Sequence, residues 1–332
     1  MKYILILFLF ASCAQKDGDT LRSFSGEALG TGYVVQFYSA KQFPVQEKFD
    51  SVVAAINQSM STYIPDSDIS RINAGDSTVV VDDMFKEVLS QSREVYKNTS
   101  GFYDPTVGIL VNAYGFGPGK PIISLNKEIL DSIRQYVGLD EISLSPEGKI
   151  LKDNSAVYID FNSIAKGYCI DRLGVMLEQN GVTDYLIEMG GELRARGSNI
   201  EKESPWKVGI ENIDAPIEDR GYTKIVTLGD KGMAGSGNYR KFRVDSVTGQ
   251  RFVHTVNPLN GLAEKTDVLS ATVIAPTCAK ADAYATAIMA MGLERSIIVL
   301  DNLDDVDAYI LYAKSDSTAT YISKGFVKYL LD

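Results

Sequence analysis

The chain has 332 residues, of which 45% are hydrophobic and 23% are charged. This length and composition are typical of a globular protein with a proper core, organised as one large domain or two ordinary ones. The formal net charge of −10 argues against nucleic acid as a partner, because phosphate backbones attract basic surfaces.

The chain begins with MKYILILFLFASC, in which one lysine precedes a short apolar run that ends in small residues. The run is too short to span a bilayer but suits the hydrophobic region of a secretory signal peptide. A cysteine at this place resembles the processing site of bacterial lipoproteins, although Phe10 stands where leucine is usual. We predict a signal peptide over residues 1–12, a lipid on Cys13 and a flexible tether over residues 13–25. An ordinary signal peptide with an incidental cysteine is the alternative.

The rest of the chain alternates segments typical of strands and of helices, which predicts an α+β fold. Strands, indicated by β-branched and aromatic residues, are expected at residues 29–38, 156–161, 184–197, 206–212, 224–242, 268–276, 306–313 and 318–330. Helices, indicated by helical apolar spacing, are expected at residues 45–60, 83–99, 163–180 and 278–292. Residues 61–75 are rich in turn formers. No linker or solenoid repeat divides the chain, so we predict a single compact domain over residues 26–332.

Two motifs combine polar residues with turn signals. In GFYDPTVG, Asp104 precedes Pro105, which favours an extended backbone and leaves the carboxylate available for either a tight turn or a ligand. In IDFNSIAKGYCID, a predicted strand ends just before a predicted helix, so backbone N–H groups and Lys166 converge at a helix N-terminus. Such an arrangement favours a phosphate group, although the segment is not a Walker loop.

Two further motifs follow in the second half of the chain. The segment AGSGNYR is rich in glycine, which indicates either a ligand close to the backbone or a tight hairpin turn. The segment HTVNPLNG contains His254, the only histidine of the chain. A single histidine is most often structural. Here a strand and the helix of residues 278–292 follow it, so an imidazole, a carboxylate and a hydroxyl group could meet at one edge of the sheet.

The helix predicted over residues 278–292 places Asp282 and Thr286 on the same side as Ala281 and Met289, and that side should be buried. A buried carboxylate without a partner is costly. Two explanations stay open: Asp282 forms a buried ion pair with a lysine or arginine, or a divalent cation neutralises it. Carboxylate and hydroxyl oxygens suit Mg²⁺, and a single histidine cannot form a histidine-rich zinc site.

The remaining cysteines, Cys169 and Cys278, both lie in predicted helices and lack any metal-binding spacing. We interpret them as small core residues. The sequence leaves a disulfide between them undecided.

Several segments, taken in order, resemble the ApbE-type flavin transferases: GFYDPTVG, IDFNSIAKGYCID, MGGELRARG, GSGNYR, HTVNPLNG and SATVIAPTCAKADAYAT. The resemblance extends from about Gly26 to the C-terminus. It implies an α+β domain of mixed sheets with packed helices, FAD as substrate and Mg²⁺ as cofactor. It also implies transfer of FMN from FAD, through a phosphoester bond, to a threonine or serine hydroxyl of an exported acceptor protein, with release of AMP.

The resemblance also assigns residues to roles. The Mg²⁺ ligands would be Asp282, Thr286 and the backbone carbonyl of Ala165, and His254 would lie nearest the reacting phosphate. His254 or Asp282 would take the proton from the incoming hydroxyl. The FAD contacts would be Leu29, Tyr63, Asp104, Pro105, Thr106, Asn162, Lys166, Tyr168 and Val256.

The chain departs from the usual pattern at three positions. Leu29 replaces methionine, which conserves volume. Asn257 replaces an aspartate after the histidine, which removes a charge and is expected to weaken the positioning of the metal or of His254. Ala285 stands where some members have a second acidic residue, which leaves the metal fewer anionic ligands and is expected to lower its affinity. The resemblance further implies an acceptor in a membrane redox complex and a lipoprotein on the periplasmic face of a bacterial envelope. Alternatives are FAD hydrolysis to FMN and AMP, and a flavin-binding lipoprotein without catalytic activity.

Overall fold

The computed structural model of the protein describes residues 19–122, 125–213, 215, 221–237, 242–244, 251–263, 265–315 and 317–331. The predicted signal peptide, Cys13 and the first part of the predicted tether lie outside these residues. Among the described residues, no helix has the length and apolar character needed to cross a membrane.

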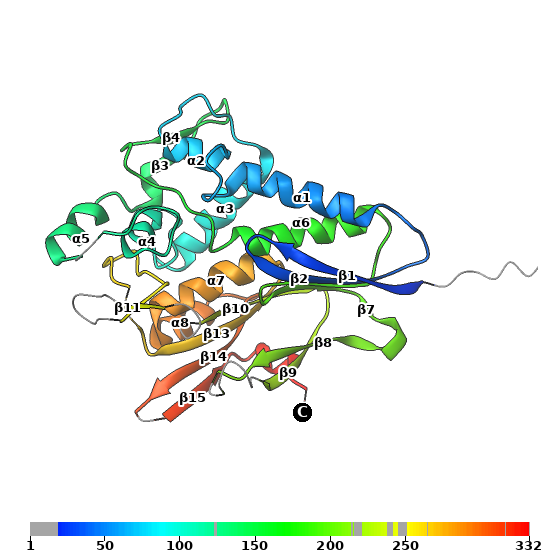
Figure 1. The fold of residues 1–332 in the computed structure, drawn as a ribbon. Coiled ribbons are helices and arrows are strands. Elements are labelled where there is room, and N and C mark those ends of the chain that lie inside the picture. Colours follow the sequence, from blue (N-terminus) through cyan, green and yellow to red (C-terminus); the bar gives the residue numbers. More distant parts are fainter. Residues whose placement is uncertain are drawn as a thin grey trace, which may run out of the picture.

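An eight-stranded sheet forms the centre of the molecule, and its strand pairs are antiparallel. The strand order is β1-β2-β5-β6-β10-β13-β14-β15, with the blue N-terminal strands at one end and the red C-terminal strands at the other (Figure 1). The strands are β1 (Thr20–Ala28), β2 (Thr31–Ser39), β5 (Tyr185–Met189), β6 (Glu192–Arg196), β10 (Lys231–Gly237), β13 (Val268–Ala275), β14 (Asp307–Lys314) and β15 (Ser317–Ile322).

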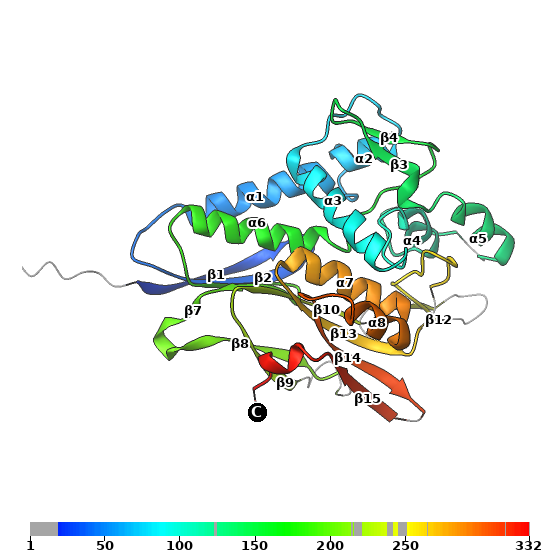
Figure 2. The same cartoon turned by 180° about the vertical axis from the view of Figure 1, so that it is seen from behind.

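Helices cover one face of this sheet, as both side views show (Figures 1 and 2). The long helices of this layer are α1 (Val45–Met60), α3 (Asp83–Asn98), α6 (Ala165–Gln179) and α7 (Cys278–Met291). Shorter helices are α2 (Asp68–Asn73), α4 (Gly108–Tyr114), α5 (Lys127–Arg134), α8 (Leu293–Leu300) and the 3₁₀ turn η1 (Leu139–Glu141). Helix α7 packs between α6, α3 and strands β10 and β13, so it is buried on nearly all sides. This environment explains its alanine-rich sequence.

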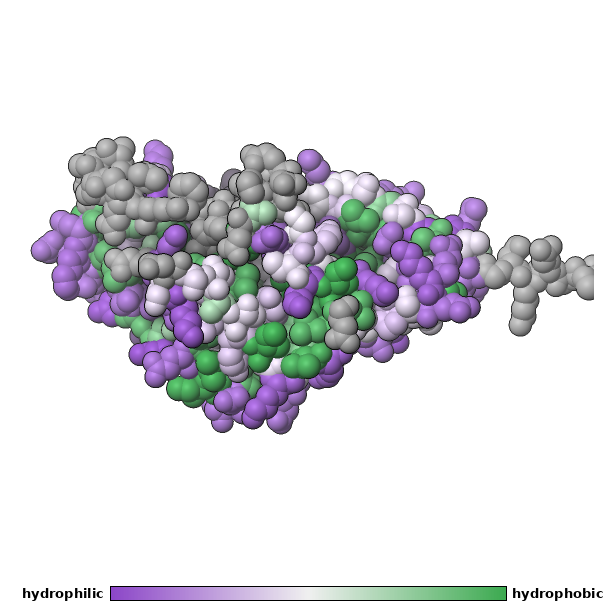
Figure 3. All heavy atoms as spheres, turned by 90° about the horizontal axis from the view of Figure 1, so that it is seen from below, coloured by the Kyte–Doolittle hydropathy of each residue, from purple (hydrophilic) through white to green (hydrophobic). Residues whose placement is uncertain are grey.

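The other face of the sheet packs on a smaller layer with its own hydrophobic cluster, in which Trp206 and Phe326 are nearly fully buried. This layer contains β7 (Ser198–Asn199), η2 (Ile200–Lys202), β8 (Ser204–Glu211), β9 (Tyr222–Leu228) and η4 (Phe326–Tyr329). Seen from this side, the surface presents hydrophobic side chains in patches between hydrophilic ones (Figure 3). Two small hairpins complete the described chain: β3 (Ile142–Leu144) with β4 (Ile150–Lys152), and β11 (Phe242–Val244) with β12 (Arg251–Val253).

The predicted fold class, a compact α+β domain of mixed sheets with packed helices, is confirmed. The four predicted helices are present within two residues of their expected ends. Cys169 and Cys278 are buried and not bonded to each other, as expected for core residues.

Some predicted boundaries are wrong. Strand β1 begins at Thr20, inside the predicted tether, because its backbone pairs with β2 along its whole length. Residues 156–161 form no strand, and only Tyr158 makes an isolated bridge, to Val107. In AGSGNYR, the residues up to Gly237 belong to strand β10 rather than to a turn. The last predicted strand ends at Ile322, after which the chain turns into η4.

Candidate functional site

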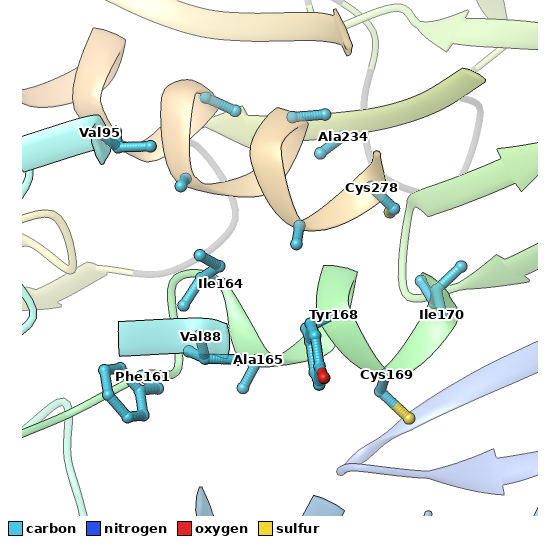
Figure 4. Packing of buried hydrophobic residues seen from close by; sticks show 14 of the residues in the cluster. Val88, Val95, Phe161, Ile164, Ala165, Tyr168, Cys169, Ile170, Ala234 and Cys278 are labelled. Carbon is cyan, nitrogen blue, oxygen red and sulfur yellow. The ribbon is translucent and has the colours of Figure 1, made fainter. Parts of the chain in front are cut away.

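The close contact between α6 and α7 positions Asp282. A Cβ atom on Gly167 would lie 2.5 Å from the carbonyl oxygen of Cys278, so only glycine permits this approach of the two helices. The backbone N–H of Gly167 donates a hydrogen bond to Oδ2 of Asp282 over 3.2 Å. In the close view, Ile164 at the start of α6 points towards α7, and Cys278 lies at the beginning of α7 (Figure 4). Asp282 therefore faces the first turn of α6, and it is buried, as the sequence pattern predicted.

A second carboxylate, Asp171 of α6, fixes the N-terminal end of α7. Its two oxygens accept hydrogen bonds from the backbone N–H groups of Cys278 and Ala279, each over 2.9 Å. Arg194 of β6 pairs with the same carboxylate at 2.7 Å. Four N–H groups at a helix start lack partners within the helix, and Asp171 satisfies two of them. No local sequence pattern indicates this role, because the contact joins residues more than a hundred positions apart.

Lys166 and Glu192 lie beside Asp282. The Lys166 ammonium group pairs with Oε2 of Glu192 at 2.5 Å, and both Glu192 and Asp282 are only 5% exposed. Burial raises the pKa of Asp282, and the nearby Lys166 charge and the Gly167 N–H offset this only in part. Burial, and then the charge of Asp282, also raise the pKa of Glu192. Glu192 was not among the residues singled out from the sequence.

This arrangement bears on the two explanations for the buried Asp282, which are an ion pair with a lysine or arginine and a bound divalent cation. Lys166 forms its ion pair with Glu192, so Asp282 has a cation nearby but no ion pair of its own in the described part of the chain. One ammonium group thus faces two buried carboxylates. The excess negative charge favours a further cation.

The described residues fit a hard divalent cation that relies on few protein ligands. Asp282 and Thr286 are one helical turn apart on α7, and the Gly167 hydrogen bond brings Asp282 to the helical turn that begins at Ala165. Carboxylate, hydroxyl and carbonyl oxygens are ligands that Mg²⁺ prefers. The described residues contain no group of three or more histidine, cysteine, aspartate or glutamate side chains that could hold a metal. A bound Mg²⁺ would therefore depend on water and substrate oxygens as well.

A second set of predicted residues gathers around Asp160. The Asn162 backbone N–H donates to Oδ1 of Asp160 over 2.8 Å, and the Asn162 side chain donates to Oγ1 of Thr62 over 3.2 Å. The backbone N–H of Asp160 donates to the carbonyl of Pro105 over 2.7 Å. Tyr63 is 60% exposed, and partial burial followed by the Asp160 charge raises its pKa. Tyr63, Asn162 and the Asp104–Thr106 segment therefore share one region.

Asp104 forms the tight turn that the sequence left open as one alternative. Its Oδ1 accepts hydrogen bonds from the backbone N–H of Thr106 over 2.8 Å and from the Thr106 hydroxyl over 2.6 Å. Its Oδ2 accepts from the backbone N–H of Leu139 over 3.1 Å. Both carboxylate oxygens are thus engaged within the protein. The Tyr168 side chain is likewise engaged within the protein, because it is buried and its hydroxyl donates a hydrogen bond to Glu87.

Burial raises the pKa of Asp160 from 3.8 to about 6, against the hydrogen bonds from Asn162. Between pH 3.8 and about pH 6 the native state binds more protons than the unfolded state. The free energy of unfolding therefore falls as the pH rises through this range. The rise corresponds to roughly 3 kcal/mol. We expect Asp160→Asn, which keeps the acceptor for Asn162, to be more stable than wild type by about 2–3 kcal/mol at pH 7.5 and by little at pH 4.

Urea unfolding at both pH values measures this difference. Asp153→Asn, at an exposed aspartate of the same region, is the control and should change the unfolding free energy little at either pH. An Asp160→Asn variant with the same advantage at pH 4 as at pH 7.5 would contradict the assignment.

The loop that carries His254 follows β12. His254 is half-buried, and Val256 packs in a hydrophobic cluster with Leu110 of α4. The Asn257 side-chain oxygen accepts a hydrogen bond from the backbone N–H of Leu259 over 3.0 Å. An amide oxygen performs this turn-forming role as a carboxylate would, so the asparagine at this position is compatible with the turn.

Two cavities border this loop. One of about 530 Å³ is lined by residues of α5, by Tyr114, by Phe252 of β12 and by loop residues that include Leu262. A smaller one of about 190 Å³ is lined by residues that include Thr255 and Asn257. Neither is lined by Lys166 or by the buried carboxylates, so these cavities do not mark the predicted metal site.

The turn between β1 and β2 approaches the site from the other side. Leu29 has a φ of 50°, in the left-handed region, and Gly30 follows with 74°. This two-residue turn leads into Thr31, whose side chain packs against Gly190, and Lys166 Nζ lies 3.2 Å from the position that a Cβ on Gly190 would take. Thr31 and Gly190 therefore bring the β1–β2 turn close to Lys166.

The comparisons agree with this architecture. The model of the ApbE family matches residues 29–310. The FAD:protein FMN transferase of Haemophilus influenzae is 32% identical, with 96% of this chain and 93% of that protein covered. The protein of the same name from Vibrio cholerae is also 32% identical, over 98% of this chain and 96% of its own length.

Solved structures give the same result. The flavin transferase ApbE from Vibrio cholerae has a TM-score of 0.83 and 30% identity, and the match covers 94% of this chain and 100% of that chain. The apo form of the Pseudomonas stutzeri flavinyl transferase ApbE has a TM-score of 0.81 and 28% identity, with 93% and 96% covered. Fold and sequence thus place the chain in the class of α+β proteins that these flavin transferase structures represent. The chain belongs to the ApbE family.

Proposed function

We propose that the protein transfers FMN from FAD to a threonine or serine hydroxyl of an exported acceptor protein, in a reaction that depends on Mg²⁺. The hydroxyl oxygen attacks the phosphorus of the FMN half, the phosphoanhydride bond breaks, and AMP leaves. The observation that carries the proposal is the buried Asp282 beside the N-terminal turn of α6, which has no ion pair of its own with any residue that the structure describes. The names of the curated relatives support the same reaction.

The chain supplies binding groups for an anionic substrate. The first turn of α6 presents backbone N–H groups, and Lys166 adds a positive charge at the same helix end. Asp282, Thr286 and the Ala165 carbonyl would hold Mg²⁺, which stabilises negative charge on phosphate oxygens during transfer. Leu29 lies in the β1–β2 turn, close to Lys166, and Tyr63 is exposed. Both residues are proposed to contact FAD.

His254 is the residue proposed to take the proton from the acceptor hydroxyl, with Asp282 as the second candidate. An imidazole is suited to this role near neutral pH. His254→Ala separates the two: because alanine cannot accept a proton, the variant should lose most of the transfer rate while its Mg²⁺-dependent stabilisation stays unchanged.

The test is an assay of the purified protein with FAD, MgCl₂ and a candidate acceptor protein. We expect AMP release that requires Mg²⁺, together with a mass increase on the acceptor that corresponds to FMN and disappears when its threonine is replaced by alanine. AMP release with free FMN and an unmodified acceptor would favour FAD hydrolysis instead. FAD binding without AMP release would favour a flavin-binding protein without catalysis.

We also propose that Cys13 carries a lipid that anchors the protein at the extracytoplasmic side of the membrane, on the periplasmic face of a bacterial envelope, near an acceptor in a membrane redox complex. The motif around Cys13 supports this location. Cys13→Ser is expected to release the protein into the soluble extract or to leave the precursor unprocessed. Fractionation of cells with an antibody against the domain measures the change, and unaltered membrane association would contradict the anchor.

A further inference from the structure

Glu192 and Lys166 form an ion pair between the first residue of β6 and the first turn of α6. The Nζ–Oε2 distance is 2.5 Å. Asp282, the next carboxylate, is as deeply buried as Glu192. An ordinary structural ion pair needs one carboxylate for each cation. The second buried carboxylate therefore requires a reason.

The turn between β5 and β6 fixes the position of Glu192. Gly190 and Gly191 have φ values of 64° and 100°, which glycine adopts without strain. A Cβ on Gly190 would lie 2.8 Å from Thr31 Cγ2 and 3.2 Å from Lys166 Nζ, so the backbone runs directly against the ammonium group. The residue that follows this turn is Glu192, and its carboxylate has little freedom to move away from Lys166.

Lys166 lies near two carboxylates but pairs with only one of them. Asp282 accepts its hydrogen bond from the Gly167 N–H instead. Asp282 nevertheless lies beside Lys166, because Gly167 is the next residue along α6. Without the charge on Glu192, Asp282 would be the carboxylate left beside this ammonium group. A Lys166–Asp282 ion pair would then occupy the oxygens that a divalent cation requires.

We propose that Glu192 is a positioning residue for the transfer reaction: it holds Lys166 away from Asp282 and so keeps Asp282 available for Mg²⁺. This inference rests on the proposed function. An ammonium group has three N–H donors, so Lys166 retains donors for a phosphate group while it is paired with Glu192. The Lys166–Glu192 ion pair thus leaves Lys166 free to bind a phosphate group and leaves Asp282 free to bind the metal.

The test compares the response of wild type and Glu192→Gln to MgCl₂ in the presence of FAD. Glutamine keeps the shape but removes the charge. We expect the MgCl₂ concentration for half-maximal thermal stabilisation, and for half-maximal transfer rate, to rise about 10- to 100-fold. The rate at saturating MgCl₂ should fall less. Glu178→Gln, which removes a charge from another ion pair between α6 and β6, is the matched control and should keep the wild-type midpoint.

The double variant Lys166→Met/Glu192→Gln tests whether Glu192 acts through Lys166. Because the competing ammonium group is then absent, the stabilisation midpoint for MgCl₂, measured for each variant at an FAD concentration that saturates it, should return towards the wild-type value. An unchanged midpoint in Glu192→Gln, or a double variant no better than the single one, would overturn the proposal. If Glu192→Gln does not fold, Glu192→Asp serves instead. The shorter side chain places its carboxylate farther from Lys166, so the midpoint for MgCl₂ should rise severalfold, and a wild-type midpoint would contradict the proposal. A wild type that does not respond to MgCl₂ would refute the proposed metal dependence itself, which distinguishes the two failures.

Discussion

The Asp282→Ala variant should lose measurable FMN transfer and all thermal stabilisation by MgCl₂, yet remain folded. Asp282 is 5% exposed and has no ion pair of its own among the described residues, so its charge is costly unless a cation neutralises it. Removing the side chain also leaves the Lys166–Glu192 pair in place. Without metal, the variant should therefore match or exceed wild type in melting temperature, whereas wild type should gain stability from MgCl₂ with FAD.

Thr286→Ala is the graded comparison, because a hydroxyl contributes less than a carboxylate to a hard cation. It should weaken the response to MgCl₂ without removing it. Thermal shift with and without MgCl₂, run beside an assay for AMP release, measures both effects. If Asp282 instead served only to stabilise the fold, Asp282→Ala would cost about 3–5 kcal/mol and MgCl₂ would not affect wild type.

The second large effect should come from Asp171→Ala. This change removes the acceptor of two backbone N–H groups at the start of α7 and leaves Arg194 without its closest carboxylate. Breaking a buried pair by removing one partner typically costs about 3–5 kcal/mol, and the lost helix cap adds to this. Urea unfolding should show a loss of that size, and activity should fall as well because α7 carries Asp282.

Glu178→Ala provides the control for Asp171→Ala. Glu178 also pairs with an arginine of β6, Arg196, but that arginine side chain is 44% exposed. Exposed pairs contribute little, but Glu178 also accepts a hydrogen bond from the Tyr185 hydroxyl over 2.7 Å, so the expected loss is about 1–2 kcal/mol, still smaller than that of Asp171→Ala. Equal losses in the two variants would show that Asp171 has no special role at the helix start.

Sequence patterns predicted the long helices well, because α1, α3 and α6 have helical apolar spacing, α7 is rich in alanine, and α3 and α7 have a capping residue. Asp82 accepts the hydrogen bond from Phe85 N–H at the start of α3, and Thr277 does the same for Lys280 at α7. Short helices such as α4 and α5 were missed, since seven or eight residues are too few to show a clear period. The apolar run of residues 156–161 indicated a strand, but it packs in the core with a single bridge as its pairing.

The site was predictable where chemistry is local and not where it depends on contacts across the fold. The unusual position of Asp282 follows from helical spacing alone. The roles of Asp171 and Glu192 depend on α6 meeting α7 and β6, which no local pattern encodes. The same holds for Asp104, since only the fold shows that Leu139 and Thr106 occupy both of its oxygens.

The early start of β1 limits how far the domain can lie from a lipid on Cys13. The first strand residue is Thr20, seven positions after Cys13, and it belongs to the eight-stranded sheet. Seven extended residues span at most about 25 Å, less than the width of the folded domain. With the proposed lipid in place, the start of β1 would stay within about 25 Å of the membrane surface. Its acceptor hydroxyl would have to lie close above the bilayer, and lengthening the stretch before Thr20 should extend the reach to acceptors farther from the membrane.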